Sequence, residues 1–227
     1  MDTLIAEDLL LLLLDDEKGA VRAGTSLPTA LGGAVLIELA LAGAVAVEDR
    51  GRWRTAQVRV EDGAAPRDPV LVDALATVAE KERSAQDLAT RLGKGLQDTL
   101  GDRLVSRGVL ERREDKVLGV FPRTRWPAAD STHEDAVRRQ VAGVLVEGAD
   151  PDPRTGALVA LLHALDQAHT VVDRRGMSAR EVRERAHQVS EGAWAATAVR
   201  DAIRAAAAEV TAAVAAVSAA TTTATLS

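Results

Sequence analysis

Six consecutive leucines, Leu9 to Leu14, stand near the start of the sequence with acidic residues directly on both sides. The apolar run is much shorter than the roughly 20 residues that a membrane-spanning helix needs. The acidic residues before it also have the wrong sign for a signal peptide. We therefore expect a helix that begins near Thr3, a possible N-cap, and ends near Gly19, with acidic residues in its first turns where the helix dipole favours them. Because such a helix has no polar face, other helices must cover it, which predicts a helical core.

The composition limits the chemistry that the chain can perform. There is no cysteine, which excludes disulfides and thiolate metal sites, and the four histidines form no HExxH or comparable pair. We therefore expect no metal and no cofactor. No nucleophile–base pattern or glycine-rich phosphate loop is visible, so we do not expect an enzyme. The net charge of −6 argues against a protein that binds polyanions over its whole surface.

Downstream of the leucine run, apolar helices alternate with two short hairpins. Pro28 and the Gly32–Gly33 pair look like breakers before an apolar helix over residues 34–42, and alternation over residues 44–60 predicts a hairpin. Residues 84–127 predict a short helix capped by Ser84, a second short helix and the second hairpin of the chain, which is the outline of a winged helix. The pattern is helical from residue 131, and residues 219–227 predict a disordered tail.

Four stretches carry a resemblance to a known family: "LIAEDLLLLLLDDEKG", "ALGGAVLIELALAG", "RLVSRGVLERRE" and "ALVALLHALDQAHTVV". The segments "GGAVLIELAL" and "LVSRGVL" are the most specific, because apolar composition alone does not produce them in that order. With this order and spacing, the sequence resembles the Golgi phosphoprotein 3 family, and its bacterial members in particular. The resemblance implies one mainly α domain over residues 1–218, with a central apolar helix core and small peripheral β-hairpins.

The resemblance also implies a peripheral membrane protein. Eukaryotic members bind the head group of phosphatidylinositol 4-phosphate on a basic face, press an apolar hairpin into the bilayer and hold the tails of membrane proteins. By position in the family's motifs, the candidates for head-group binding are Arg22, Lys94 and Gln97. The family's arginine before the second apolar helix is Gly32 here. Because Lys94 alone keeps the charge of the matched positions, we expect little selectivity among anionic head groups.

The second hairpin is the candidate for membrane contact, because it gathers apolar and basic residues and two of the four aromatic ones. Tryptophan is favoured at a membrane interface, and each basic residue near an anionic surface contributes about 1 kcal/mol. A packing role for Phe121 and Trp126, between hairpin and core, is the alternative. The candidate membrane-contacting residues are Leu118, Val120, Phe121, Arg123, Arg125 and Trp126.

These observations predict a cytoplasmic protein that associates with the inner face of the membrane and binds anionic phospholipid. Membrane-protein tails are further candidate partners, and the oligomeric state stays open. The alternative function is a winged-helix module that binds DNA or protein through residues 84–127. Asp98 and Asp102 on its candidate recognition helix would repel a nucleic-acid backbone, so we do not expect nucleic acid as a partner.

Overall fold

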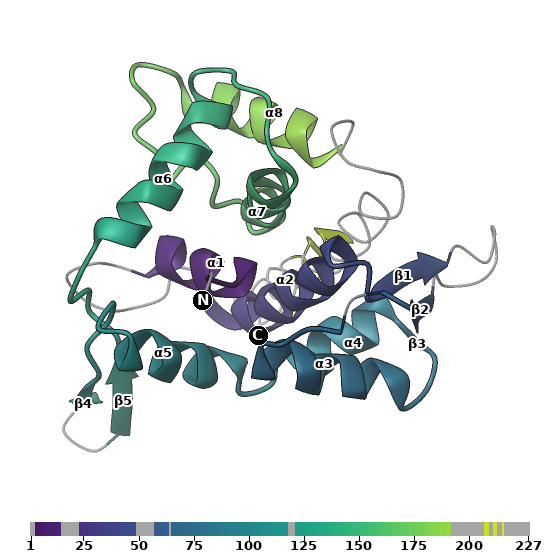
Figure 1. Ribbon diagram of the computed structural model, residues 1–227. Helices are drawn as coiled ribbons and strands as arrows, with labels where there is room; N and C mark the ends of the chain where they lie inside the picture. Colours follow the sequence, from purple (N-terminus) through teal and green to yellow (C-terminus); the bar gives the residue numbers. More distant parts are fainter. Residues whose placement is uncertain are drawn as a thin grey trace, which may run out of the picture.

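The computed structural model describes residues 3–14, 23–48, 57–63, 65–117 and 121–191, together with 207, 208, 211, 212 and 215. These residues form a mainly helical domain with two small antiparallel sheets (Figure 1), as the sequence predicted. The helices are α1 (Ile5–Leu13), α2 (Leu27–Leu41), α3 (Pro69–Ala79), α4 (Ala85–Leu92), α5 (Leu96–Ser106), α6 (Thr132–Leu145), α7 (Pro153–Ala164) and α8 (Ala179–Ser190). The strands are β1 (Val45–Glu48), β2 (Gln57–Val60), β3 (Arg83–Ser84), β4 (Arg113–Val117) and β5 (Phe121–Arg125).

The helices lie in three tiers (Figure 1). Helices α1 and α2 form the middle tier, α6 to α8 lie on one side of it, and α3 to α5 lie on the other. Helix α1 contacts helices of both outer tiers, and all nine of its residues are buried. This confirms that the leucine run belongs to the helical core, where burying each leucine contributes about 1.5–3 kcal/mol.

The start of α1 differs from the prediction. The N-cap residue is Leu4 rather than Thr3, because the Glu7 carboxylate accepts the N–H of Leu4 at 2.8 Å and so satisfies this end of the helix. The hydroxyl of Thr3 instead lies 3.0 Å from Nε2 of His133 on α6. The helix ends at Leu13, and the expected end at Gly19 lies outside the described residues.

Helix α2 is longer than expected, because the residues predicted to break it lie inside it. Pro28 occupies its first turn, where a missing N–H costs no hydrogen bond. Gly32 allows α2 to pack closely on α4, since a Cβ at this position would lie 2.0 Å from the carbonyl oxygen of Ala89 on α4. Residues 24–41 are long and apolar enough to cross a membrane, but 67% of them are buried in the domain, as in a core helix.

The contact at Gly32 makes a testable prediction. Replacing glycine by alanine inside a helix normally stabilises it by about 0.5–1 kcal/mol. Gly32→Ala should instead destabilise the protein by about 1–3 kcal/mol, because the new methyl group meets backbone that cannot move aside. Urea unfolding measures the change. The control is Gly143→Ala on α6, where no atom lies within 4 Å of the added Cβ, and which should be neutral or stabilising. Equal effects of the two substitutions would contradict the close packing of α2 on α4.

Two acidic side chains in the first turn of α1 are buried, with Glu7 0% and Asp8 4% exposed. Burying a carboxylate is costly unless it is paired and hydrogen-bonded. The pairing groups come from helices of all three tiers, and we call the whole set the α1 ionic cluster. Its members are Glu7, Asp8, Glu38, Asp68, Arg103, Arg107, His133 and Arg154.

The Glu7 half of the cluster connects α1 to α3 and α5. Arg103 donates to Glu7 at 3.1 Å and makes a bidentate pair with Asp68, with both distances 2.7 Å. Arg107 donates to the second oxygen of Glu7 at 3.2 Å. Asp68 also caps α3 by accepting the N–H of Val70 at 2.9 Å. The hydrogen bonds from Arg103 hold the pKa of Asp68 below its usual value, so this carboxyl stays ionised.

The Asp8 half of the cluster connects α1 to α2, α6 and α7. Arg154 donates to Asp8 at 3.0 Å and to Glu38 at 2.8 Å, and Glu38 accepts the N–H of Ile5 at 2.6 Å. His133 lies 2.7 Å from the other oxygen of Asp8. Burial raises the pKa of Glu38, whereas the Ile5 N–H and Arg154 favour its ionised form. The acids of the first turn therefore do more than complement the helix dipole, since they tie α1 to helices of both outer tiers.

Both predicted hairpins are present. Strands β1 and β2 pair antiparallel from Val45 opposite Val60 to Glu48 opposite Gln57, and β3 pairs with the other side of β2. Strands β4 and β5 pair from Arg113 opposite Arg125 to Val117 opposite Phe121. With α4 and α5 before it, the second hairpin completes the helix–helix–hairpin order predicted for residues 84–127.

Histidines lie between α7 and α8. The ring centroids of His163 on α7 and His187 on α8 are 5.4 Å apart. Burial, together with the neighbouring His187, lowers the pKa of His163 below its usual value of 6.5. Burial and the charge of Arg183 likewise lower the pKa of His169.

These histidines predict how stability depends on pH. A histidine whose pKa is lower in the folded state stabilises the fold above pH 6.5, and this contribution is lost as the pH falls through the folded-state pKa. The melting temperature should therefore decrease from pH 7 toward pH 5. The decrease should be smaller in His163→Gln, which cannot acquire a charge. A melting temperature that rises in this interval would contradict the assignment.

Candidate functional site

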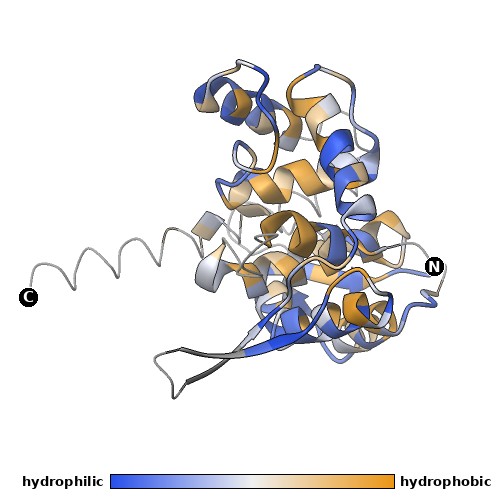
Figure 2. Ribbon diagram, turned by 90° about the vertical axis from the view of Figure 1, so that its left-hand side faces the viewer, coloured by the Kyte–Doolittle hydropathy of each residue, from blue (hydrophilic) through white to orange (hydrophobic). Residues whose placement is uncertain are grey.

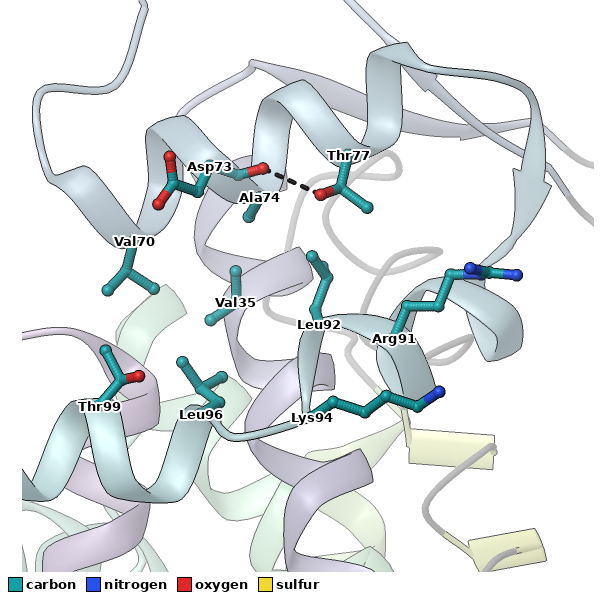
Figure 3. A pocket seen from close by; sticks show the side chains of 10 residues that line it. All are labelled: Val35, Val70, Asp73, Ala74, Thr77, Arg91, Leu92, Lys94, Leu96 and Thr99. Atoms are coloured by element: carbon teal, nitrogen blue, oxygen red, sulfur yellow. Dashed lines mark hydrogen bonds between the residues drawn. The ribbon is translucent and has the colours of Figure 1, made fainter.

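A polar groove of about 230 Å³ lies between α3 and the turn that joins α4 to α5 (Figure 3). Val35 of α2 forms its floor, and four residues of α3 form one wall. The other wall carries two cationic side chains, Arg91 at the end of α4 and Lys94 in the turn. The lining residues are Val35, Val70, Asp73, Ala74, Thr77, Arg91, Leu92, Lys94, Leu96 and Thr99.

Two glycines fix the position of Lys94. Gly93 ends α4 and packs on α2, where a Cβ would lie 1.9 Å from the carbonyl oxygen of Pro28. Gly95 has a φ of +71° and is the N-cap residue of α5. Only glycine adopts this left-handed conformation without strain, so the turn can be this short. Lys94 therefore stands between a helix C-terminus held against the core and the N-terminus of the next helix.

The arrangement suits an anion. The N-terminus of α5 has no capping side chain, since Gly95 offers none, and it carries the positive end of the helix dipole. Among the described residues, Lys94 forms no ion pair, whereas Arg91 pairs with Asp87 at 2.9 Å along α4. A phosphate or carboxylate at this end of the groove would meet the ammonium of Lys94 and N–H groups at the start of α5, while the exposed Asp98 in the same turn would repel it and weaken the binding.

The structure describes two of the three residues proposed for head-group binding, Lys94 and Gln97. Lys94 lines the groove, but Gln97 is half-buried on α5 and is not among the lining residues. Arg22 lies outside the described residues. Gly32 packs against α4, so no arginine fits at that position. Arg91 and Asp73 were missed, because they come from separate helices and only the folded chain brings them to one groove.

The second hairpin extends away from the helical body (Figure 2). Leu118 and Val120, at its tip, lie outside the described residues, as do the side chains of Phe121 and Arg123, although their backbone belongs to β5. The side chain of Arg125 is half-buried. The residues expected to contact a membrane are therefore described only at the base of the hairpin.

At this base, the prediction for Trp126 was wrong. Its side chain is 3% exposed and packs on Gly101 of α5, where a Cβ would lie 2.6 Å from the indole nitrogen. Trp126 thus anchors the hairpin to the core, as the alternative reading had it, and does not contact a membrane. The sequence signal for this role was Gly101 in the middle of α5, which leaves space for the indole ring.

The surface of α5 does not suit DNA. Arg103 and Arg107 turn inward to Glu7, and Asp98 and Asp102 are exposed. The exposed side of the candidate recognition helix is therefore acidic, and its basic side chains are engaged inside the protein. A recognition helix needs the opposite arrangement.

Among the described residues, no group of three or more histidine, aspartate or glutamate side chains is arranged so that it could hold a metal ion. The family model described as Golgi phosphoprotein 3 (GPP34) matches residues 5–206. This match covers the three tiers of helices and both hairpins. A search among curated proteins finds no match to the chain.

Proposed function

The chain belongs to the Golgi phosphoprotein 3 family, and from this membership we propose that it is a peripheral membrane protein that binds anionic phospholipid surfaces. The observation that carries the proposal is the ammonium of Lys94, which forms no ion pair with any described residue, beside the N-terminus of α5, which has no capping side chain. Both features favour a phosphate, and a groove rather than a flat surface surrounds them. Because the sequence resembles bacterial members of the family, we propose that the protein contacts the inner face of a bacterial membrane.

The hairpin supports the same proposal from a second direction. It extends from the body (Figure 2), and its base carries Arg113, which also pairs with Glu111 at 2.9 Å, and the half-buried Arg125. Basic side chains near an anionic surface each contribute about 1 kcal/mol, and the attraction decreases with salt. The groove and the hairpin together would hold the protein on the membrane through weak contacts that add up.

The proposal predicts that Lys94→Gln weakens binding to acidic vesicles by about fivefold, since about 1 kcal/mol is lost. Co-sedimentation with vesicles of phosphatidylcholine and phosphatidylglycerol, at low salt, measures the affinity. The matched control is Arg180→Gln on α8, whose side chain is 86% exposed and which lies in the opposite tier (Figure 1). Removing this charge should leave binding almost unchanged.

Two results would contradict the proposal. The first is that the wild-type protein stays in the supernatant with acidic vesicles at low salt. The second is that both substitutions reduce binding equally. In the second case only net charge would matter, and the groove would have no special role. Far-ultraviolet circular dichroism of each variant shows whether the fold is intact.

A further inference from the structure

The contact between the α7 end of the chain and α8 contains a histidine that its partner holds in the neutral form. Nε2 of His169, in the loop after α7, lies 3.0 Å from a guanidinium nitrogen of Arg183 on α8. An arginine can only donate hydrogen bonds, so Nε2 accepts this one and carries no proton. Protonation of His169 would replace the hydrogen bond by two cations in contact. The side chain of His169 is 18% exposed, so water screens their repulsion only in part.

A second pair of rings lies one turn further along α8. His187 follows Arg183 by four residues, so both side chains lie on the same side of this helix. The ring centroids of His187 and His163 on α7 are 5.4 Å apart. Two neutral imidazoles pack at this distance, whereas two imidazolium ions repel each other. Acid therefore turns two favourable contacts between α7 and α8 into repulsive ones.

Acidic side chains near these rings oppose the repulsion only in part. Asp166 lies 3.8 Å from His169, but it is already paired with Arg183 at 2.6 Å. Glu191, after the end of α8, also favours the charged form of the ring on α7. Arg174 acts in the opposite sense on His169. Burial and the neighbouring cationic groups prevail, because the pKa of each of the two rings on the α7 side lies below the usual value of 6.5.

Few other contacts hold α8 on the domain (Figure 1). Its buried residues are only Val182, Ala186 and Val189, and it packs mainly on α7. Arg185 adds hydrogen bonds to carbonyl oxygens of Val144 and Gly148, at 3.3 and 3.2 Å. Elements with few buried apolar contacts open locally at a lower free energy than the whole domain unfolds. Helix α8 can therefore open while α1 and α2, most of whose residues are buried, stay folded.

We propose that the contact between α7 and α8 is an acid-sensitive switch, in which protonation of His163 and His169 releases α8 while the middle tier stays folded. Release would expose the apolar face of α8 and the side of α7 that it covers. The pH would then set the ratio of a closed form and an open form. This inference concerns the fold itself and does not depend on the proposed binding of lipid.

Hydrogen exchange of the whole protein, followed by mass spectrometry at pH 7 and pH 5.5, tests the switch. Rates are corrected for the intrinsic effect of pH on exchange. A histidine that takes up a proton only on opening raises the opening constant by up to about tenfold per pH unit. We therefore expect peptides from α8 to exchange about fivefold faster at pH 5.5 than at pH 7. Equal corrected rates at the two pH values would overturn the inference.

The same experiment in low, non-denaturing urea separates local opening from global unfolding. Urea accelerates exchange in proportion to the surface that an opening exposes. Peptides from α8 should exchange faster than those from α2 and should depend less on urea. If both helices exchange at the same rate with the same dependence on urea, α8 opens only when the whole domain unfolds, and there is no switch.

Substitution of the two histidines tests the cause. The amide oxygen of His169→Gln can still accept a hydrogen bond from Arg183 but cannot acquire a charge, and His163→Gln removes the other titrating ring. In the double variant the corrected exchange of α8 should be equal at the two pH values. An increase that persists would show that other groups drive the opening, which would overturn the inference.

Arg183→Gln gives an independent test on the surface of α8, which holds even if the double variant does not fold. Without this guanidinium, the charged form of His169 meets no adjacent cation on α8, so the increase in exchange at pH 5.5 should be smaller than in the wild-type protein. The matched control is Arg180→Gln, because Arg180 is 86% exposed and pairs with Glu184 along the same helix. This control should keep the full increase. An equal reduction in both variants would indicate an effect of net charge and would overturn the switch.

Discussion

Replacing Arg154 by alanine is expected to lower the free energy of unfolding by about 3–5 kcal/mol, because it leaves buried carboxylates without their partner. Arg154 donates to Asp8 and to Glu38, and it also donates to the carbonyl oxygen of Thr3. Asp8 is 4% exposed and the side chain of Arg154 is 37% exposed, so water replaces the lost guanidinium only in part. Urea unfolding at neutral pH measures the change.

Two further variants separate this explanation from simple loss of packing. Arg180→Ala, on the exposed side of α8, should change the free energy by less than about 0.5 kcal/mol. Adding Asp8→Asn and Glu38→Gln to Arg154→Ala should restore part of the lost stability, since no uncompensated charge then remains buried. If the triple variant is no more stable than Arg154→Ala, the carboxylates are not the cause.

The second large effect is expected at Arg103. Arg103→Ala removes the bidentate pair with Asp68 and one partner of the fully buried Glu7, so the cost should be about 3 kcal/mol or more. The pH dependence identifies the cause. The folded-state pKa of Asp68 lies below its usual value of 3.8, so the pair stabilises the fold above pH 3.8 and is lost as the pH falls further.

The difference in unfolding free energy between the wild-type protein and Arg103→Ala should therefore decrease below pH 3.8. Urea unfolding at a series of pH values measures it. A difference that is the same at all pH values would indicate that Arg103 contributes through packing of its alkyl chain rather than through its charge. Vesicle binding of the folded variant should be unchanged, because Arg103 faces the core.

The helices and hairpins that the sequence predicted correctly are those whose formation depends on residues close together in the chain. The leucine run, the hairpins and the Ser84 cap, whose hydroxyl accepts the N–H of Asp87 at 3.2 Å, all follow from neighbouring residues. The predicted break at Pro28 and Gly32 was wrong, because a tertiary contact with α4 decides the conformation there. The same holds for Trp126, whose burial depends on a glycine 25 positions earlier in the chain.

The candidate site was predicted only at Lys94, the one head-group candidate that lines the groove. Asp73, which also lines the groove, lies on another helix, and no spacing rule relates the two positions. The α1 ionic cluster was missed for the same reason. The partners of Glu7 and Asp8 follow them by 96 and 146 residues, so the acids could be read only as favourable to a helix dipole.

The position of α1 in the middle tier has a consequence for the order in which the chain acquires its structure. During synthesis the leucines emerge early, but Arg154 is made 146 residues after Asp8. Until then the most apolar segment has neither its charge partners nor its cover, and contacts of such long sequence separation form slowly. We therefore expect the nascent chain to expose this apolar segment until α6 and α7 are made, so truncated products should aggregate rather than fold.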